Sequence, residues 1–271
     1  MMPLLPVAFL LVFALVAIIL IVYIQPHSLL KLANRLFPRV LFCVNVTTPV
    51  CAITIDDVPS QHTAAILDAL RDCNARATLF VIGGNVASKE YDGRALLLRA
   101  LREGHELGNH TWHDRASVSL PLPQLTHEVE RVETLLAELE AATGGRPRRQ
   151  ASDESAGEPR GGGPRQRLLD VPKTRWFRPG HGWFSSAVLD VAARAGLRTA
   201  LGSVFPFDPA VQSVAINSTY LRYRVHPGGV VILHDGAGRW ATAATLRAAL
   251  PALQARGFEF VTLSELCQIA K

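Results

Sequence analysis

Two adjacent carboxylates, Asp56 and Asp57, follow the apolar run 52–55 and precede Pro59. A pair of solvated turn residues is the simplest interpretation. Neighbouring carboxylates repel each other unless a cation or a shared proton compensates their charge. A bound metal ion would remove that repulsion, so the pair is a candidate for a metal site.

A second group of chemically capable residues lies between positions 104 and 114, where His105, His110 and His113 occur together with acidic residues. His110 and Asp114 are four residues apart and would face the same way on a helical turn. Such a pair can hold one ion, as two histidines do in metalloproteases. By itself this density of ligand-type residues suggests a metal without naming a reaction.

Two later segments also place functional groups where a ligand could reach them. A glycine on each side of His181 lets the backbone approach a bound molecule closely. His234 follows the unbroken apolar run 230–233, where it could serve as a general acid. A structural histidine capped by Asp235 is the alternative for this position.

The elements that must position these residues follow from the alternation of short apolar runs with amphipathic stretches after Pro49. Strands are expected at 52–55, 77–82, 105–107, 176–177, 197–201, 230–233 and 258–261. Helices are expected at 62–72, 94–102, 125–142, 185–195, 241–255 and 263–270. Repeated strand–helix units predict an α/β fold with a parallel sheet, and their number favours a barrel with its chemistry at the carboxyl ends of the strands.

The four segments, in this order, resemble the motifs of the NodB-homology polysaccharide deacetylases (carbohydrate esterase family 4, which includes chitin-deacetylase-like enzymes). Residues 54–59 are similar to the family's T-F-D-D-G-P, with Ile55 for Phe and Val58 for Gly, and 104–111 to its G-H-E-(I/L)-x-N-H-T run. Residues 178–182 resemble R-P-P-Y-G, and His234 closes an apolar L-x-H strand. The resemblance covers about residues 51–266, and four motifs in order make it specific.

The resemblance implies a distorted (β/α) barrel that binds one divalent metal, usually zinc. It also implies a hydrolase that removes N-acetyl groups from a glycan containing N-acetylglucosamine. By similarity Asp56 is the general base, and Asp57 and His110 bind the metal. The backbone N–H of His181 would bind the oxyanion, and His234 would protonate the leaving amine.

Three further roles come from the same resemblance. Arg178 would orient Asp56, and Asp208 stands where the family often carries an acid that tunes the catalytic histidine. Trp183, beside His181, would contribute to substrate binding.

The sequence departs from the family at two places. Asp114 stands where a second histidine is usual, and aspartate is an acceptable zinc ligand, so the expected ligands are Asp57, His110 and Asp114. A small backbone shift that brings in His113 is the alternative. Gly180 and His181 replace Pro–Tyr, which leaves the backbone donor in place but can change the contacts with the sugar.

Residues 3–24 carry no charge and are long enough to cross a bilayer as a helix. No Lys or Arg precedes them and no good cleavage site follows, which favours an uncleaved anchor over a signal peptide. The expected organisation is a transmembrane anchor at 1–25, a juxtamembrane linker at 26–48, and a deacetylase domain at 49–271.

The orientation of this anchor is ambiguous in the sequence. Lys31, Arg35 and Arg39 would keep the following domain cytoplasmic by the positive-inside rule. The glycan substrate and the sequons at Asn45 and Asn217 favour a lumenal or extracellular domain, and we expect that orientation.

Charge and cysteine content argue against two other classes of protein, those that bind nucleic acid and zinc fingers. Residues 141–175 hold eight Lys or Arg against four Asp or Glu, which gives 8 − 4 = +4 of the net charge of +5. This Gly/Pro/Arg-rich stretch, about 143–174, is expected to be a disordered insert and not a nucleic-acid surface. The cysteines form no C-x-x-C pair, which argues against a zinc finger, and Cys51 and Cys73 could be bridged or remain buried thiols.

Two rival functions remain from the sequence. The chain could be an amidohydrolase acting on a small or lipid-linked amide, or a catalytically inactive glycan-binding protein. The second is disfavoured because the expected catalytic and metal-binding residues are present together, and a decayed site usually loses several of them.

Overall fold

The computed structural model describes residues 9, 12–13, 23, 26–144 and 175–270. Within them, one sheet is built from β1 (Val40–Leu41), β2 (Val50–Val58), β3 (Ala77–Val81), β4 (Glu106–Asn109), β5 (Arg175–Phe177), β6 (Leu197–Ala200), β7 (Val230–His234) and β8 (Glu259–Val261). The strands follow the order β1-β6-β5-β4-β3-β2-β7, with β8 also paired to β2. Every paired strand is parallel to its neighbour, which confirms the predicted parallel α/β architecture.

The strands at the two ends of this order, β1 and β7, lie close to each other. Cys43, just after β1, forms a bridge with Gly229, just before β7, and Val204, beyond β6, forms a bridge with Val231 of β7. The sheet is therefore curled toward closure, joined at one side by single bridges instead of a continuous ladder.

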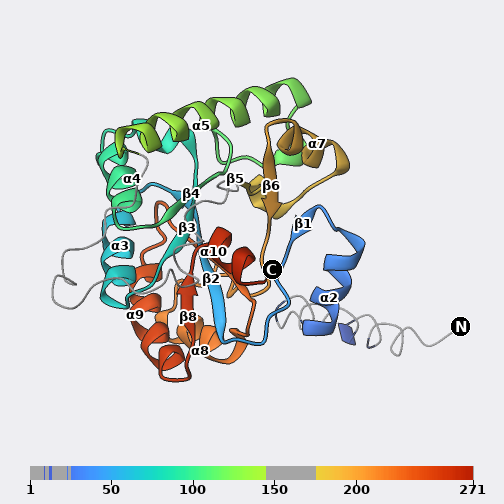
Figure 1. Ribbon diagram of the computed structural model, residues 1–271, viewed down its shortest axis with the longest axis vertical. Helices are drawn as coiled ribbons and strands as arrows, with labels where there is room; N and C mark the ends of the chain where they lie inside the picture. Colours follow the sequence, from blue (N-terminus) through green and yellow to red (C-terminus); the bar gives the residue numbers. More distant parts are fainter. Residues whose placement is uncertain (1–8, 10–11, 14–22, 24–25, 145–174, 271) are drawn as a thin grey trace, which may run out of the picture.

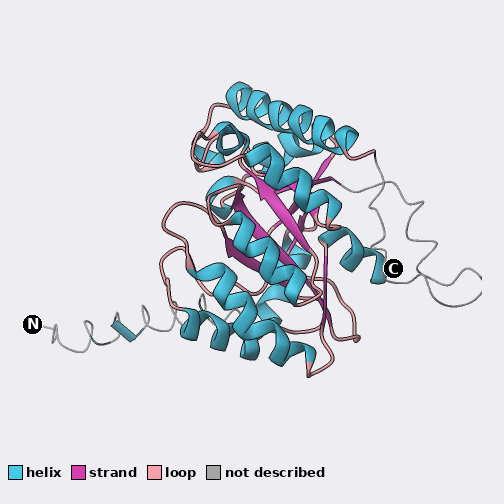
Figure 2. Cartoon of the chain, turned by 90° about the vertical axis from the view of Figure 1, so that its left-hand side faces the viewer, coloured by secondary structure: helices cyan, strands magenta, loops and turns pink. Residues whose placement is uncertain are grey.

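The helices pack side by side around the outside of the sheet (Figures 1 and 2). Each helix contacts the next in the order α8 (Val214–Arg224), α9 (Ala241–Gln254), α3 (Thr63–Asp72), α4 (Gly93–Arg102), α5 (Leu122–Ala142) and α7 (Ser186–Arg194). The last helix, α10 (Leu263–Ile269), packs against β2. Several start where a side chain caps the first turn, as Asp92, Ser185 and Thr262 do for α4, α7 and α10.

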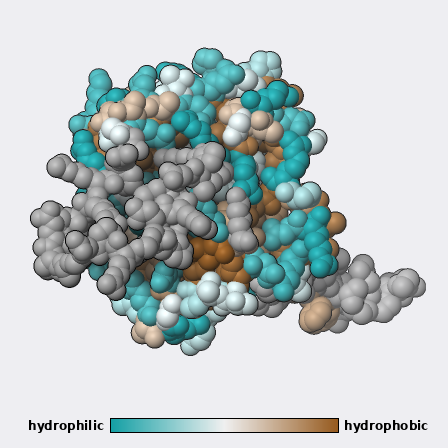
Figure 3. All heavy atoms as spheres, viewed as in Figure 1, coloured by the Kyte–Doolittle hydropathy of each residue, from teal (hydrophilic) through white to brown (hydrophobic). Residues whose placement is uncertain are grey.

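The central strand β2 is enclosed on both faces, by helices on the outer side of the sheet and by α10 and side chains of the other strands on the inner side. All nine residues of β2 are buried, and strands enclosed in this way are expected to be almost continuously apolar. The polar side chains at its end, Asp56 and Asp57, are therefore an exception that needs partners. On the face seen in Figure 3, hydrophilic residues predominate around the periphery and hydrophobic atoms gather toward the middle.

Residues 26–48, expected to be a linker, contribute two elements to the fold. They form α2 (His27–Leu36) and β1, whose Val40 and Leu41 pair with Thr199 and Ala200 of β6. The side chain of Asn34 ties the helix to the strand by donating to the carbonyl of Cys43 at 3.1 Å and accepting from the N–H of Phe42 at 3.2 Å. The segment is therefore part of the same folded unit as the sheet.

The predicted anchor at 1–25 falls almost entirely outside the described residues, and so does the predicted insert at 143–174 apart from its first two positions. No helix in the described part of the chain is long and apolar enough to cross a bilayer. Both segments stay predictions.

The structure also bears on two further predictions, a disulfide bridge and a glycosylation site. Cys51 and Cys73 are buried free thiols, so the bridge between them is absent. Asn217 is 1% exposed and donates its side-chain amide to the carbonyl of Val211 at 2.8 Å. The sequon at this position is therefore inaccessible in the folded chain and gives no support to a lumenal domain.

A buried histidine next to β4 makes the fold sensitive to acid. The ring of His105 lies against β3, where its Nδ1 accepts from the backbone N–H of Ala77 at 3.1 Å. Burial, with the nearby charges of Arg76 and Arg99, lowers the pKa of His105 to about 4. Below pH 6.5 His105 is therefore protonated in the unfolded chain but stays neutral in the folded chain. Protonation favours the unfolded state, so the free energy of unfolding falls as the pH drops toward 4.

We expect the substitution His105→Gln to remove this acid sensitivity. Between pH 7.5 and pH 5 the wild-type chain should lose about 2 kcal/mol more free energy of unfolding than the variant does, given the shift from 6.5 to about 4. Urea denaturation at the two pH values measures the difference. His127→Gln, at an exposed position on α5, is the control, and equal losses in His105→Gln and the wild type would contradict the prediction.

Candidate active site

The end of β2 brings two consecutive carboxylates into one pocket. Consecutive side chains of a regular strand point to opposite faces of the sheet. Here the pairing of β2 with β3 shifts register between Ile55 and Val58, and Asp57 adopts a left-handed φ of 63°. This bulge lets both Asp56 and Asp57 line the same pocket, of about 470 Å³.

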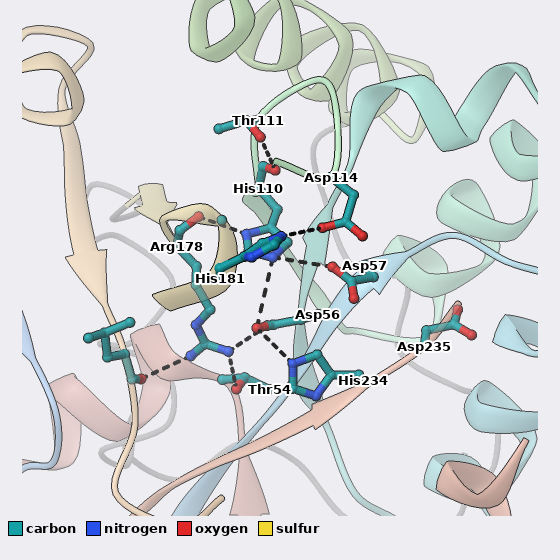
Figure 4. Close-up of polar contacts among 12 residues, drawn as sticks. Thr54, Asp56, Asp57, His110, Thr111, Asp114, Arg178, His181, His234 and Asp235 are labelled. Atoms are coloured by element: carbon teal, nitrogen blue, oxygen red, sulfur yellow. Dashed lines mark hydrogen bonds and ion pairs between the residues drawn. The ribbon is translucent and has the colours of Figure 1, made fainter. Parts of the chain in front are cut away.

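Asp56 is held by a buried arginine. Arg178, directly after β5 and 1% exposed, donates from Nη1 to Asp56 Oδ1 at 2.6 Å and to Thr54 Oγ1 at 2.7 Å (Figure 4). Its Nε and Nη2 donate to the carbonyls of Ala200 and Leu201 at 3.1 and 2.9 Å. All three nitrogens of the guanidinium therefore have acceptors, and one of them is the carboxylate of Asp56.

The electrostatics keep Asp56 ionised. Burial raises the pKa of this carboxyl, but the charge and hydrogen bond of Arg178, with smaller contributions from the neighbouring histidines, outweigh burial and hold the pKa below its ordinary value. Asp56 is thus a carboxylate at neutral pH, in the form that a general base requires.

His234 stands on the other side of Asp56, and its pKa is shifted in the opposite direction. Its Nδ1 is 3.0 Å from Asp208 Oδ1, and its backbone N–H donates to Asp208 Oδ2 at 2.8 Å. Burial lowers the pKa of His234, but Asp208 and Asp56 raise it above the ordinary value. The Nε2 atom lies 3.8 Å from Asp56 Oδ2, and the raised pKa favours the protonated form of the ring beside the ionised carboxylate.

Asp235 has a different role from the one weighed in the sequence. Its carboxylate accepts from the hydroxyls of Ser60 and Thr63 and from the N–H of Gly236, not from His234. Asp208, from the loop before α8, is the partner of the histidine.

A histidine–aspartate pair next to this centre has the geometry of two metal ligands. His110 Nδ1 lies 2.7 Å from the carbonyl oxygen of Arg178, and its Nε2 lies 3.3 Å from Asp57 Oδ1. Ligand atoms of a tetrahedral zinc with bonds of about 2.1 Å stand about 3.4 Å apart. Burial also lowers the pKa of His110, which favours the neutral ring that binds metals.

The third expected ligand is not in position. Asp114 lines the pocket, but its carboxylate is 57% exposed and lies 3.5 Å from His181 Nε2. The alternative, His113, turns toward α5, where its Nδ1 is 3.1 Å from Glu128 Oε1. Across the described ranges no group of three His, Cys, Asp or Glu side chains is arranged to hold a metal, so the structure brings two of the three predicted ligands together.

The turn Gly180–Gly182 presents His181 at the pocket with a left-handed φ of 60°. A Cβ on Gly180 would lie 2.1 Å from the carbonyl oxygen of Arg115, so this position must be glycine for the turn to pack. Trp183 follows on the surface and is 70% exposed. The substitution of Pro–Tyr by Gly–His thus keeps a tight turn beside the pocket.

Sequence reasoning missed Arg239, which lies in the loop after β7 and makes an ion pair with Asp57. It also missed Phe42 and Phe205, which line the pocket. None of them belongs to a motif, and only the glycines at 236 and 238 mark the loop that carries Arg239.

We expect Arg178→Met to destabilise the protein by about 3–5 kcal/mol at neutral pH, because it leaves the buried carboxylate of Asp56 without its counter-charge. Urea denaturation measures the change. Arg175→Met is the matched control: this arginine is 39% exposed in its ion pair with Glu133 and should cost less than about 1 kcal/mol. The double variant with Asp56→Asn should recover part of the loss, and a single variant as stable as the control would contradict the argument.

Comparisons with known proteins identify the family of this chain. A family model described as polysaccharide deacetylase matches residues 44–151. A peptidoglycan-N-acetylglucosamine deacetylase of Bacillus cereus is 33% identical over 233 residues, which is 80% of this chain and 87% of that protein. A chitooligosaccharide deacetylase of a Bradyrhizobium species is 31% identical over 79% of this chain and 89% of its own length.

Solved structures share the fold. The peptidoglycan deacetylase PdaC of Bacillus subtilis superposes with a TM-score of 0.61 at 24% identity, covering 83% of this chain and 93% of that one. The sequence match to the Bacillus cereus relative, over four fifths of the chain, is sufficient to show the family. The chain belongs to the polysaccharide deacetylases, and it is a hydrolase of that class.

Proposed function

We propose that this protein removes the N-acetyl group from N-acetylglucosamine units of a glycan, with the help of one divalent metal, zinc. The observation that carries the proposal is the position of Asp56. Its carboxylate is held by Arg178 at 2.6 Å, faces His234 Nε2 at 3.8 Å, and adjoins the Asp57–His110 pair. A base, an acid and two metal ligands thus surround one pocket.

The substrate class rests on the relatives. One matched relative is named for N-acetylglucosamine in peptidoglycan and another for chitooligosaccharides. Both names describe a sugar that carries an acetamido group, so we assign the same class of substrate to this chain.

Two of the three proposed ligands have side chains at a separation that suits one bound metal ion. Asp57 Oδ1 and His110 Nε2 have the right separation, and the contact of His110 Nδ1 with a backbone carbonyl fixes the ring so that Nε2 is available. Asp114 would complete the set by turning from His181 toward the pocket. When bound there, the metal would supply Lewis-acid polarisation of the acetyl carbonyl and of the attacking water.

The chain's own residues would divide the proton transfers. Asp56, ionised and oriented by Arg178, would take a proton from the attacking water. His234, kept protonated by Asp208, would donate its Nε2 proton to the departing amine nitrogen, so the amide C–N bond breaks without leaving an anionic amide. The backbone N–H of His181 would donate to the developing oxyanion, and the exposed ring of Trp183 would contact a neighbouring sugar.

We also propose that residues 1–25 anchor the chain in a membrane and that the catalytic domain is lumenal or extracellular, where a glycan is reached. The uncharged run at 3–24 supports the anchor. The deacetylase domain, expected at 49–271, is proposed to include residues 26–48 as well, because β1 in this segment pairs with β6 of the sheet.

Acetate release from N-acetylglucosamine oligomers by the full chain, supplied with zinc, tests the reaction. We expect Asp56→Asn to lower kcat/KM by at least about 100-fold, because the amide cannot accept the proton from water. Asp68→Asn, an aspartate on α3 that pairs with Arg99 away from the pocket, should keep the wild-type rate.

Two results would redirect the proposal. Wild-type acetate release by Asp56→Asn would remove Asp56 from the role of base. No acetate from a folded, zinc-loaded wild-type chain at any oligomer length would indicate a small or lipid-linked amide as substrate, and a wild-type chain that also fails to bind zinc would indicate a binding role.

The third ligand has its own test. We expect Asp114→Ala to weaken zinc binding by more than about 100-fold, because loss of a ligand should exceed the 10–100-fold effect of losing an outer partner. His113→Ala should change the zinc Kd little, since its ring contacts Glu128. Competition with a chromophoric chelator measures both, and a larger loss in His113→Ala would favour the alternative ligand set.

A further inference from the structure

We propose that Arg239 is a positioning residue of the metal site, which fixes Asp57 through one carboxylate oxygen and leaves the other oxygen free for the metal. The inference rests on the proposed function, because it assumes that Asp57 and His110 bind a cation. It adds to that site a residue outside the four motifs.

The two oxygens of Asp57 have different partners. Oδ1 faces His110 Nε2 at 3.3 Å, the separation expected for two ligands of one ion. Oδ2 accepts a charge-assisted hydrogen bond from Arg239 Nη1. The carboxylate therefore lies between the guanidinium and the proposed metal position, and both contacts can exist at once.

Arg239 is itself held in place. Its Nη1 also donates to the backbone carbonyl of Asp235 at 3.0 Å, and its backbone N–H donates to the carbonyl of Gly236 at 3.1 Å. Gly236 has a φ of 114°, a conformation that a side chain would strain, and the arginine side chain packs over the space that a Cβ would take. The carboxylate of Asp235 is tied to Ser60 and Thr63, so the support is rigid.

A positioned carboxylate matters here because the backbone of Asp57 is unusual. A left-handed φ of 63° at an aspartate is a sparsely populated conformation that persists only when its surroundings hold it. Outer partners that orient a ligand typically contribute 10–100-fold to metal affinity. Without Arg239, the side chain of Asp57 would lose the contact that sets its rotation about the Cβ–Cγ bond.

Charge balance is compatible with this role. Asp56 is paired with Arg178 and Asp57 with Arg239, while Asp114 stands in the same pocket at its rim. With the His234–Asp208 pair counted as neutral, three carboxylates and two arginines leave a net charge of −1. An incoming divalent cation therefore still meets a negative site, although the chain carries an aspartate where the family usually has a second neutral histidine.

The test measures zinc Kd for the full chain by competition with a chromophoric chelator, together with the visible absorption spectrum of the cobalt-loaded protein. We expect Arg239→Gln to weaken zinc binding by about 10-fold, the lower end of the range for outer partners, and to alter the cobalt spectrum because Asp57 is no longer fixed. Arg239→Lys, which keeps the positive charge and hydrogen-bond donors but not the planar guanidinium, should recover part of the affinity.

Arg247→Gln is the matched control, since Arg247 lies on α9 and pairs with Asp72 at 3.2 Å outside the pocket; its Kd and spectrum should equal those of the wild type. An Arg239→Gln variant that binds zinc as tightly as the wild type, or more tightly, would overturn the inference, the second result showing that the arginine competes with the metal. A wild-type chain that binds no zinc would instead refute the proposed metal site, and the inference with it.

Discussion

The ion pair between Arg178 and Asp56 is the interaction on which the site depends. A buried guanidinium is tolerated only when its donors are satisfied, and here they meet a carboxylate, a hydroxyl and two backbone carbonyls. These partners belong to β2, to the end of β6 and to the residue after it. One side chain from the end of β5 therefore joins strands that are not all neighbours in the sheet, and the pocket floor cannot shift without breaking several hydrogen bonds at once.

The pKa values of two neighbouring groups in this site are shifted in opposite directions. Asp56 and His234 lie 3.8 Å apart, yet the pKa of the first is held below its ordinary value and that of the second above it. Arginine on one side and Asp208 on the other produce the difference. Pairs of groups whose surroundings push their pKa values apart are the usual arrangement for an acid and a base in one enzyme, and each charged form also stabilises the other.

Much of the site and the parallel α/β fold followed from the sequence, because chemically distinctive residues stood at the ends of apolar runs. Asp56, Asp57, His110 and His234 are brought together as expected. The helix α8 was missed because its buried positions include Asn217 and Ser218, so the apolar periodicity that marks a helix is absent. Contacts made by loop residues, such as Arg239 on Asp57, depend on the folding of turns that carry no periodic signal, and the exact position of Asp114 depends on a backbone turn in the same way.

The pairing of β1 with β6 has a consequence for how the protein can be shortened. β1 covers the outer row of N–H and C=O groups of β6, and Phe42 next to it lines the pocket. Removal of the chain up to position 48, a natural choice from the sequence, would uncover a sheet edge ready to pair with another molecule. Self-association of such a fragment would result from the loss of β1. The shortest fragment that does not associate in this way should begin before α2.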